Sequence, residues 1–343
     1  MAALKQGSWI IKAGALAATG VRAARKQGSW IIKAVALAAT FAIVFGLIQA
    51  GVIDSYFEAM IVTMGINIVL ATSLNLITGF TGQFSLGHAG FMAVGAYATA
   101  LTVLKFPTVW GFLLGLVIGG AIAAVIGFLI GLPTLRLRGD YLAIATLGMA
   151  EIIRVALLNM PFTNGAAGLF GMPRMINWPW LFVLVVGTVL LIANLLRSVH
   201  GRDMIAVRED EIAASSVGVS ALRAKTTAFV VGAVFGAVAG GMYSLYFYVI
   251  QPAQFTFMKS IDILIIVVLG GLGSLSGTII AAVLLTVVEA FLTSFPELRM
   301  VIYGVILVVI MVFRPQGLMG DRELTLSALR RLIPWRKPVG ESA

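Results

Sequence analysis

Long apolar runs separated by short polar stretches dominate this chain. Most runs approach the roughly 20 residues that a helix needs to cross the hydrocarbon core of a membrane. They lack the period-two alternation of barrel strands, whereas a helix satisfies its own backbone hydrogen bonds inside lipid. We therefore predict an all-α polytopic membrane protein with about ten transmembrane helices. The predicted helices are residues 35–53, 56–78, 85–104, 109–132, 141–158, 178–196, 226–249, 260–272, 277–295 and 298–313.

The composition also indicates a membrane protein. Hydrophobic residues make up 60% of the 343 residues and charged residues only 11%, against roughly 25% charged residues in soluble domains. The mean hydropathy is +1.04, and a soluble fold of this size has too small an interior to bury so much apolar surface. Cysteine is absent and the histidines are His88 and His200. We therefore expect no disulfide, no thiolate nucleophile and no metal site.

The net charge of +10 is unevenly distributed along the chain. If the N-terminus is cytoplasmic and each predicted helix crosses once, nineteen of the 24 Lys and Arg residues lie on the cytoplasmic side. Cytoplasmic loops of membrane proteins carry such an excess. The distribution predicts that both termini are cytoplasmic, and it assigns the basic charge to loops and the lipid bilayer, with no nucleic acid as a partner. Segments 260–272 and 277–295 could also form a re-entrant pair, which would preserve this orientation.

The pattern divides the chain into three parts. Residues 1–34 form a basic N-terminal extension in which KQGSWIIKA occurs twice, at 5–13 and 26–34. We interpret this repeat as a local duplication rather than a repeated fold, and either an amphipathic helix on the inner leaflet or a disordered tail fits it. Residues 35–313 form the transmembrane domain, and 314–343 form a basic cytoplasmic tail.

Few ionisable side chains fall within the predicted helices, namely Glu58, Glu151, Arg154, Asp262 and Glu289. Such groups are costly at membrane depth and are therefore functional candidates. Glu151 and Arg154 are three residues apart on one helical face, which predicts an intramembrane charge pair with a structural role. Glu289 has no charged neighbour in sequence, as expected of a carboxylate in a proton-coupled carrier.

Two glycine-rich stretches, residues 79–90 and 270–277, interrupt the helical pattern. A phosphate-binding loop usually contains a Lys that both stretches lack, so we do not expect nucleotide binding there. Broken helices that line a polar path and plain turns are the remaining interpretations. The candidate path residues are Gly82, Ser85, Gly87, His88 and Gly273, together with Glu289 from a later helix.

Another glycine pattern predicts close helix packing. Gly232, Gly236 and Gly240 form a GxxxGxxxG ridge in the predicted helix at 226–249. Helices approach each other closely across such ridges. The ridge therefore predicts a bundle rather than a single membrane anchor.

The polar segment 197–225 differs from every other connection because it contains nine charged residues on the predicted cytoplasmic side. Apolar residues among the charges predict one or two short amphipathic helices. The segment holds no nucleophile–base grouping, so we expect no catalytic residue in it. We predict a docking surface for a soluble cytoplasmic partner, and a solvated loop is the alternative. Its candidate contact residues are Arg202, Asp203, Arg208, Glu209, Asp210 and Glu211.

Several blocks of the sequence resemble one permease family. The blocks are GFTGQFSLGHAGFMAVGAYATA at 79–100, RLRGDYLAIATLGMAEIIR at 136–154, GRDMIAVREDEIAASSVGV at 201–219, SIDILIIVVLGGLGSLSGTIIAA at 260–282 and FRPQGL at 313–318. They are similar to LivM-type permeases, within the LivH/LivM family of branched-chain amino acid ABC importers. The resemblance extends from about residue 56 to 320 and does not include residues 1–34.

The resemblance implies a function and a set of partners. Permeases of ABC importers engage their ATPases through a loop with the signature EAA-x-x-x-G, and Ala213, Ala214 and Gly218 match its later positions, while Ile212 replaces its Glu. It follows that 197–225 is an ATPase-coupling loop. The implied assembly contains a LivH-like second permease, two cytoplasmic ATPases that use ATP and Mg²⁺, and an extracytoplasmic substrate-binding protein, in a prokaryotic inner (plasma) membrane. This chain itself would then have no ATP site and would not be an enzyme.

Two questions remain open at this stage. Closely similar permeases import urea, short amides or other neutral amino acids, so the resemblance leaves the cargo undecided. A carrier driven by an ion gradient is an alternative of another class, and it would depend on Glu151, Asp262 and Glu289.

Overall fold

The structure is a computed structural model with one large described region. It describes residues 54–135, 137 and 139–292, with shorter pieces at 39, 41–42, 44–51, 302, 304–305 and 317–319. The predicted extension at 1–34 lies outside the described residues. Part of the predicted helix at 35–53, and most of the predicted helix at 298–313 and of the tail at 314–343, also lie outside them.

The chain divides into two compact units. One unit consists of Met1–Asp54 and Leu324–Ala343, and in it the described residues between 39 and 49 are helical. The other unit, Ser55–Glu323, contains all of the elements that follow.

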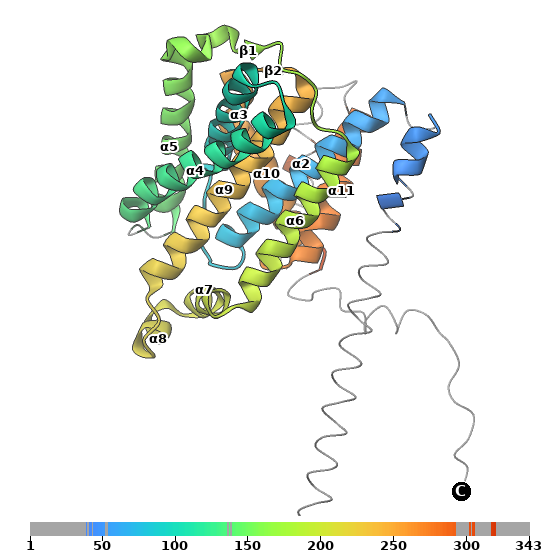
Figure 1. Ribbon diagram of the computed structural model, residues 1–343. Helices are drawn as coiled ribbons and strands as arrows, with labels where there is room; N and C mark the ends of the chain where they lie inside the picture. The colour runs from blue at the N-terminus through green and yellow to red at the C-terminus, as the bar shows by residue number, and fades with distance from the viewer. Residues whose placement is uncertain are drawn as a thin grey trace, which may run out of the picture. The chain divides into compact units, whose positions relative to one another are not determined.

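Eight long helices form the described part of the larger unit (Figure 1). They are α2 (Ser55–Thr78), α3 (His88–Lys105), α4 (Val109–Thr134), α5 (Asp140–Asn159), α6 (Trp178–Arg197), α9 (Ala221–Phe247), α10 (Phe257–Gly270) and α11 (Leu275–Leu292). Each coincides with one helix predicted between residues 56 and 295. Within the described residues, seven helical segments are long and apolar enough to cross a membrane. The prediction of an all-α polytopic membrane protein is therefore confirmed.

The helix α3 is not one of those seven segments. Most of its residues are buried, and it packs against α4, α5 and α9. Because neighbouring helices shield α3 from lipid, it does not need the apolar surface of a lipid-exposed helix. It forms the centre of the bundle.

Glycines allow α9 to approach α2 and α3 closely. A Cβ atom on Gly240 would meet the carbonyl oxygen of Met92 in α3. A Cβ atom on Gly232 would come within 2.5 Å of Cδ1 of Ile77 in α2. The GxxxGxxxG ridge thus packs between helices, as the sequence pattern predicted.

Hydrogen bonds join α2 and α11 in an antiparallel pair along most of their length. The bonds run from Tyr56 Oη to the Ala290 carbonyl at 2.9 Å, from Asn67 Nδ2 to Thr286 Oγ1 at 2.9 Å, and from Asn75 Nδ2 to Thr278 Oγ1 at 2.8 Å. Since α2 is long and apolar enough to span a membrane, α11 traverses the same depth. This register favours two full crossings by α10 and α11 over a re-entrant pair.

Short elements connect the helices at the two ends of the bundle. At one end lie η1 (Pro161–Thr163), η2 (Gly165–Ala167), β1 (Leu169–Phe170), β2 (Val249–Ile250) and η3 (Pro252–Gln254), with β1 and β2 paired antiparallel. At the other end lie α7 (Val199–Glu209) and α8 (Glu211–Ser216), as Figure 1 shows. Arg174 contacts Glu58 at 2.6 Å near the first of these ends, a pairing that no sequence pattern predicts.

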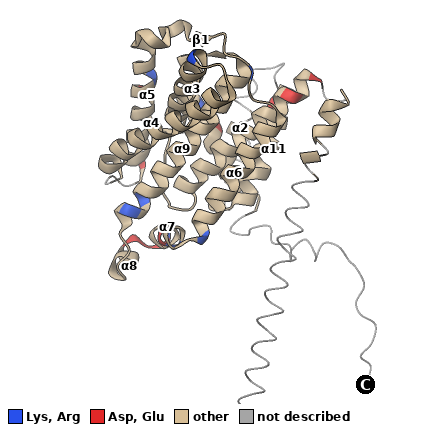
Figure 2. Ribbon diagram, in the orientation of Figure 1, with Lys and Arg blue, Asp and Glu red and all other residues tan. Residues whose placement is uncertain are grey.

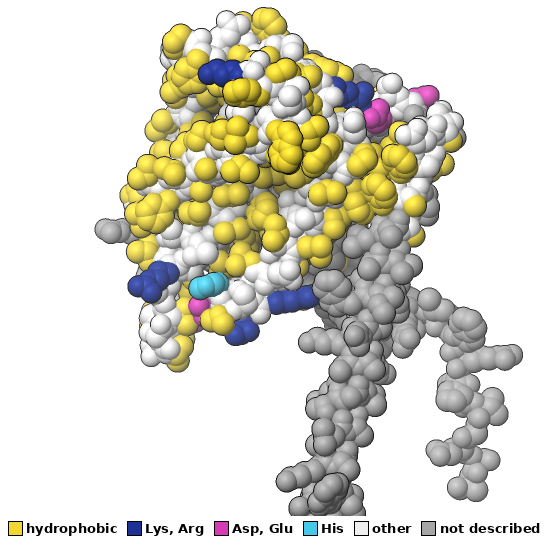
Figure 3. All heavy atoms as spheres, viewed as in Figure 1, with side chains coloured by type: hydrophobic (Ala, Val, Ile, Leu, Met, Phe, Trp, Pro, Cys, Tyr) yellow, Lys and Arg dark blue, Asp and Glu magenta, His cyan; other side chains and the backbone are white. Residues whose placement is uncertain are grey.

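The surface matches a protein embedded in a membrane. Hydrophobic side chains cover the middle of the face shown in Figure 3, and Lys and Arg side chains lie toward its two ends. Exposed residues of this apolar kind include Val117 and Val125 of α4 and Val183 and Leu191 of α6. Figure 2 shows several charged positions around α7 and α8, at the end where the charge distribution predicts the cytoplasm.

Candidate functional site

The charged segment 197–225 forms two short helices, α7 and α8. The side chain of Ser198 accepts a hydrogen bond from the backbone N–H of Gly201 at the start of α7. Asp210 ends α7 and begins α8, since its Oδ1 accepts hydrogen bonds from the N–H groups of Ile212 at 2.8 Å and Ala213 at 2.9 Å. Such N-cap bonds satisfy backbone donors that the helix itself leaves unpaired. The result is a rigid bend in the segment.

One side of α7 packs into the bundle. Met204 and Val207 are buried in a cluster with Leu76, Phe80 and Leu275. These three residues belong to the end of α2, to the loop after it and to the start of α11. The buried apolar contact fixes α7 against both of those regions.

The other side of the segment faces away from the bundle. Ile212 and Val217 are 76% and 78% exposed, which is unusual for aliphatic residues on a short polar element. Gly218, with φ of +89°, follows α8 at this exposed tip. Glu211 and Lys225 form an ion pair of 2.8 Å that ties α8 to α9. The tip is a small apolar surface surrounded by charges, as expected of a docking element.

The remaining candidate residues of this segment lie around that tip. Arg202, Glu209 and Ala213 are exposed, Asp203 is half-buried, and Ala214 is buried against the bundle. Of the two alanines that match the EAA-x-x-x-G signature, Ala213 therefore lies on the exposed face of α8 and Ala214 on the face packed against the bundle.

The two glycine-rich breaks meet at the end of the bundle that carries α7. Asn75 of α2 is fully buried and closes the break between α10 and α11. Its Oδ1 accepts a hydrogen bond from the Gly273 N–H at 3.0 Å, and its Nδ2 donates to the Ser274 carbonyl at 3.0 Å. Gly79, the first residue of the other break, packs directly against the backbone of Gly273.

Arg208 of α7 contacts both breaks. A Cβ atom on Gly82 would lie 3.4 Å from Cγ of Arg208, and a Cβ atom on Gly273 would meet its Nη1. Both glycines have positive φ values, +71° and +89°, which favour glycine. The helices α2 and α10 also end here, so the guanidinium lies near two helix C-termini, where a positive charge is favourable. The sequence had placed Arg208 and the two glycines in separate candidate groups.

The other predicted path residues hold the start of α3 inside the bundle. His88 is 1% exposed, and its Nε2 lies 2.8 Å from Oγ of Ser73 in α2. Ser85 is also buried, and Gly87 packs against the backbone of Thr146 in α5. These residues fix a helix end at some depth within the protein, and they do not line the cavity described next.

A cavity of about 650 Å³ opens at the opposite end of the bundle, between α2, α10 and α11. Glu289, Asp262 and Lys259 line it together with Met92 of α3 and Tyr243 of α9. Pockets of a few hundred cubic ångströms with apolar walls and a few polar groups suit small ligands. Glu289 is the one predicted path residue that lines this cavity; Asp262 was predicted only as an intramembrane charge.

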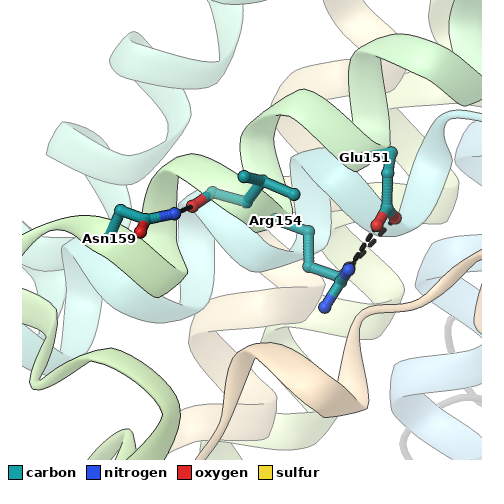
Figure 4. Close-up of polar contacts among 4 residues, drawn as sticks. Glu151, Arg154 and Asn159 are labelled. Carbon is teal, nitrogen blue, oxygen red and sulfur yellow. Dashed lines mark hydrogen bonds and ion pairs between the residues drawn. The ribbon is translucent and has the colours of Figure 1, made fainter.

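Glu151 and Arg154 form an ion pair on α5 (Figure 4). The Nε atom of Arg154 donates to both carboxylate oxygens of Glu151, at 2.9 and 3.0 Å, and its Nη2 also contacts Oε1. The side chain of Glu151 is 44% exposed on the outside of the chain. The predicted ion pair is therefore present, and it lies on the outer surface of α5 rather than in the core of the bundle.

Comparison with known proteins places these features in a family. The model of the family described as branched-chain amino acid transport system / permease component matches residues 56–311. The high-affinity branched-chain amino acid transport system permease protein LivM of Escherichia coli (strain K12) is 39% identical over 293 residues, which cover 74% of this chain and 68% of the relative.

More distant relatives include both kinds of permease subunit. The probable LivM of Methanocaldococcus jannaschii is 23% identical, over 78% of this chain and 94% of the relative. The permease protein LivH of Escherichia coli (strain K12) is 25% identical, over 77% of this chain and 94% of the relative. No solved structure matches the chain. The chain belongs to the family of permease components of branched-chain amino acid transport systems.

Proposed function

We propose that this chain is the membrane-spanning permease subunit of an ATP-driven importer for branched-chain amino acids. The observation that carries the proposal is that α7 packs against both glycine-rich breaks, while α8 presents an exposed apolar tip. A partner that moves the tip would therefore move the two breaks with it. The names of the LivM and LivH relatives support the cargo.

The proposed assembly contains this chain, a LivH-like second permease, two cytoplasmic ATPases and an extracytoplasmic binding protein. The tip at Ile212 and Val217 docks in a groove of an ATPase, and Arg202, Glu209 and Asp210 contact its rim. The ATPases bind ATP and Mg²⁺ and supply the driving energy. We assign the α7 end, both termini and the tail at 314–343 to the cytoplasm of a prokaryote, and residues 35–313 to ten crossings of its inner membrane.

The cavity at the opposite end receives the amino acid from the binding protein. Its carboxylates, Glu289 and Asp262, suit an ammonium group, and Lys259 suits a carboxylate. Met258 and Tyr243 supply apolar surface for an aliphatic side chain. The helices then rock between an outward and an inward opening as the ATPases bind and hydrolyse nucleotide.

Uptake by the reconstituted assembly tests the proposal. Proteoliposomes that contain both permeases and the ATPases, with the binding protein outside, should accumulate radiolabelled leucine only when ATP is enclosed. Excess unlabelled isoleucine or valine should compete, and urea should not. Competition by urea or short amides would reassign the cargo within this class. Uptake without ATP, driven by an ion gradient alone, would contradict the proposal in favour of a secondary carrier.

A further inference from the structure

The outward face of α5 differs from the other outward helix faces of the bundle. Its inward side, which includes Thr146, Ala150 and Leu157, is buried. Its opposite side consists of residues spaced three or four apart, which places them on one helical stripe. These residues are Tyr141, Ile144, Gly148, Glu151, Ile152, Val155 and Asn159.

An ion pair lies on this stripe, near the middle of an apolar span. Glu151 and Arg154 satisfy each other, but a half-exposed carboxylate that faces hydrocarbon is unfavourable even when it is paired. Charged groups within transmembrane segments normally face the interior of a bundle or a water-filled cavity. The exposed position of the pair therefore indicates that something other than lipid covers it.

The shape of the same stripe points to another helix. Within the described residues, a Cβ atom on Gly148 would meet no atom within 4 Å. Gly148 therefore lies on an open surface of α5, which Glu151, Ile152 and Val155 also line. A small residue on such a face allows the backbone of a second helix to approach closely.

The helices α4 and α6 provide the contrast. The sequence of α4 contains no charged residue, and that of α6 contains only Arg197 at its end. Their large exposed residues, such as Val125 and Val183, are apolar. The outward faces of α4 and α6 can therefore contact lipid favourably, whereas the outward face of α5 carries an ion pair that lipid solvates poorly.

The inward side of α5 adjoins one of the glycine-rich breaks. The N–H of Leu86 donates a hydrogen bond of 3.0 Å to Oγ1 of Thr146, and Gly90 packs against Ala150. A subunit on the outward side of α5 would therefore lie one helix away from the buried start of α3. This position suits a path that runs between two permease subunits.

We propose that the outward face of α5 is the surface on which the second, LivH-like permease subunit packs. The partner contributes a helix with small residues opposite Gly148 and hydrogen-bonding side chains opposite the Glu151–Arg154 pair. The relatives support a partner of the same family, because they include both LivM and LivH permeases. This inference rests on the proposed function.

Photo-crosslinking in the complete importer tests the interface. A benzophenone amino acid is introduced at Ile152 or, as a control, at Val183 of α6, and the two native residues are matched at 61% and 58% exposure. After irradiation in native membranes, position 152 should cross-link to the second permease and position 183 should not. Cross-links from position 152 to lipid or to another copy of this chain, in a complex that contains the second permease, would overturn the interface. If no second permease co-purifies with the unmodified chain, the proposed function fails as well.

A pair of glycine variants gives an independent measurement. Gly148→Leu and Gly187→Leu form a matched pair, because at both positions an added Cβ atom meets no described atom within 4 Å. At equal amounts in the membrane, Gly148→Leu should reduce recovery of the second permease about ten-fold, and Gly187→Leu should leave it unchanged. Unchanged recovery with Gly148→Leu, or an equal loss with both variants, would overturn the proposal.

Discussion

The guanidinium of Arg208 in α7 lies against Gly273, in the break between α10 and α11. Through this contact and its packing on Gly82, α7 meets both interruptions of the bundle. A displacement of α7 cannot leave the two breaks in place, since close-packed interiors deform little.

Arg208→Ala should uncouple the ATPases from transport. The variant removes the side chain that contacts both breaks but keeps the exposed tip of α8, so the ATPases should still co-purify. Leucine uptake per ATP hydrolysed should fall by a factor that corresponds to about 0.5–2 kcal/mol of coupling energy. The measurement is parallel uptake and phosphate release in proteoliposomes. Lys105→Ala, an exposed basic side chain at the end of α3, is the control and should leave the ratio unchanged; equal ratios for both variants would contradict the assigned role.

Asn75→Ala should destabilise the protein strongly. It removes hydrogen bonds to Gly273, Ser274 and Thr278 and leaves the Gly273 N–H without its partner, at a cost of about 1–3 kcal/mol for the unsatisfied group. The Ser274 carbonyl keeps its hydrogen bonds from Thr278. Thermal inactivation of the detergent-purified protein at one fixed scan rate measures the loss. Asn194→Ala serves as the comparison, because Asn194 is exposed on α6. A similar loss in both variants would argue against Asn75 as the closing residue of the break.

Gly240→Ala and Gly187→Ala should change stability in opposite directions. The methyl group on Gly240 meets the Met92 carbonyl and forces α9 away from α3, which costs about 1–3 kcal/mol. The methyl group on Gly187 meets nothing within 4 Å, so the higher helix propensity of alanine adds up to about 1 kcal/mol. Thermal inactivation of the detergent-purified protein measures the stability of both variants. Stabilisation by Gly240→Ala would refute the close packing of α3 and α9.

Single cysteines should report the two ends of the bundle from opposite sides of the membrane. The chain contains no cysteine, so Ala166→Cys in η2 and Ser216→Cys in α8 each create one exposed thiol. In intact cells whose outer membrane has been permeabilised, an impermeant maleimide should label position 166. It should label position 216 only after the inner membrane is opened. Labelling of both thiols from one side would contradict the proposed orientation.

The helices and the charged segment could be predicted from the sequence because both depend on local patterns. The apolar run at 56–78 corresponds to α2, and the cluster around Asp210 marks a bend between two short helices. Contacts between distant residues leave no such pattern. Asn75 and Gly273, or Glu58 and Arg174, meet only because the bundle aligns α2 with segments far along the chain. The sequence pattern predicts path residues at Gly82 and Gly273, and their contact with Arg208 of the charged segment is visible only in the fold.

The central position of α3 has a consequence for how the protein is made. This helix begins at a buried histidine, ends at Lys105 and is not among the segments long and apolar enough to cross a membrane, so lipid alone is a poor environment for it. Its main cover, α9, is synthesised long after it. During biogenesis α3 therefore depends on α2 and α4, or on an insertase that shelters it, until α9 arrives and the bundle closes around it.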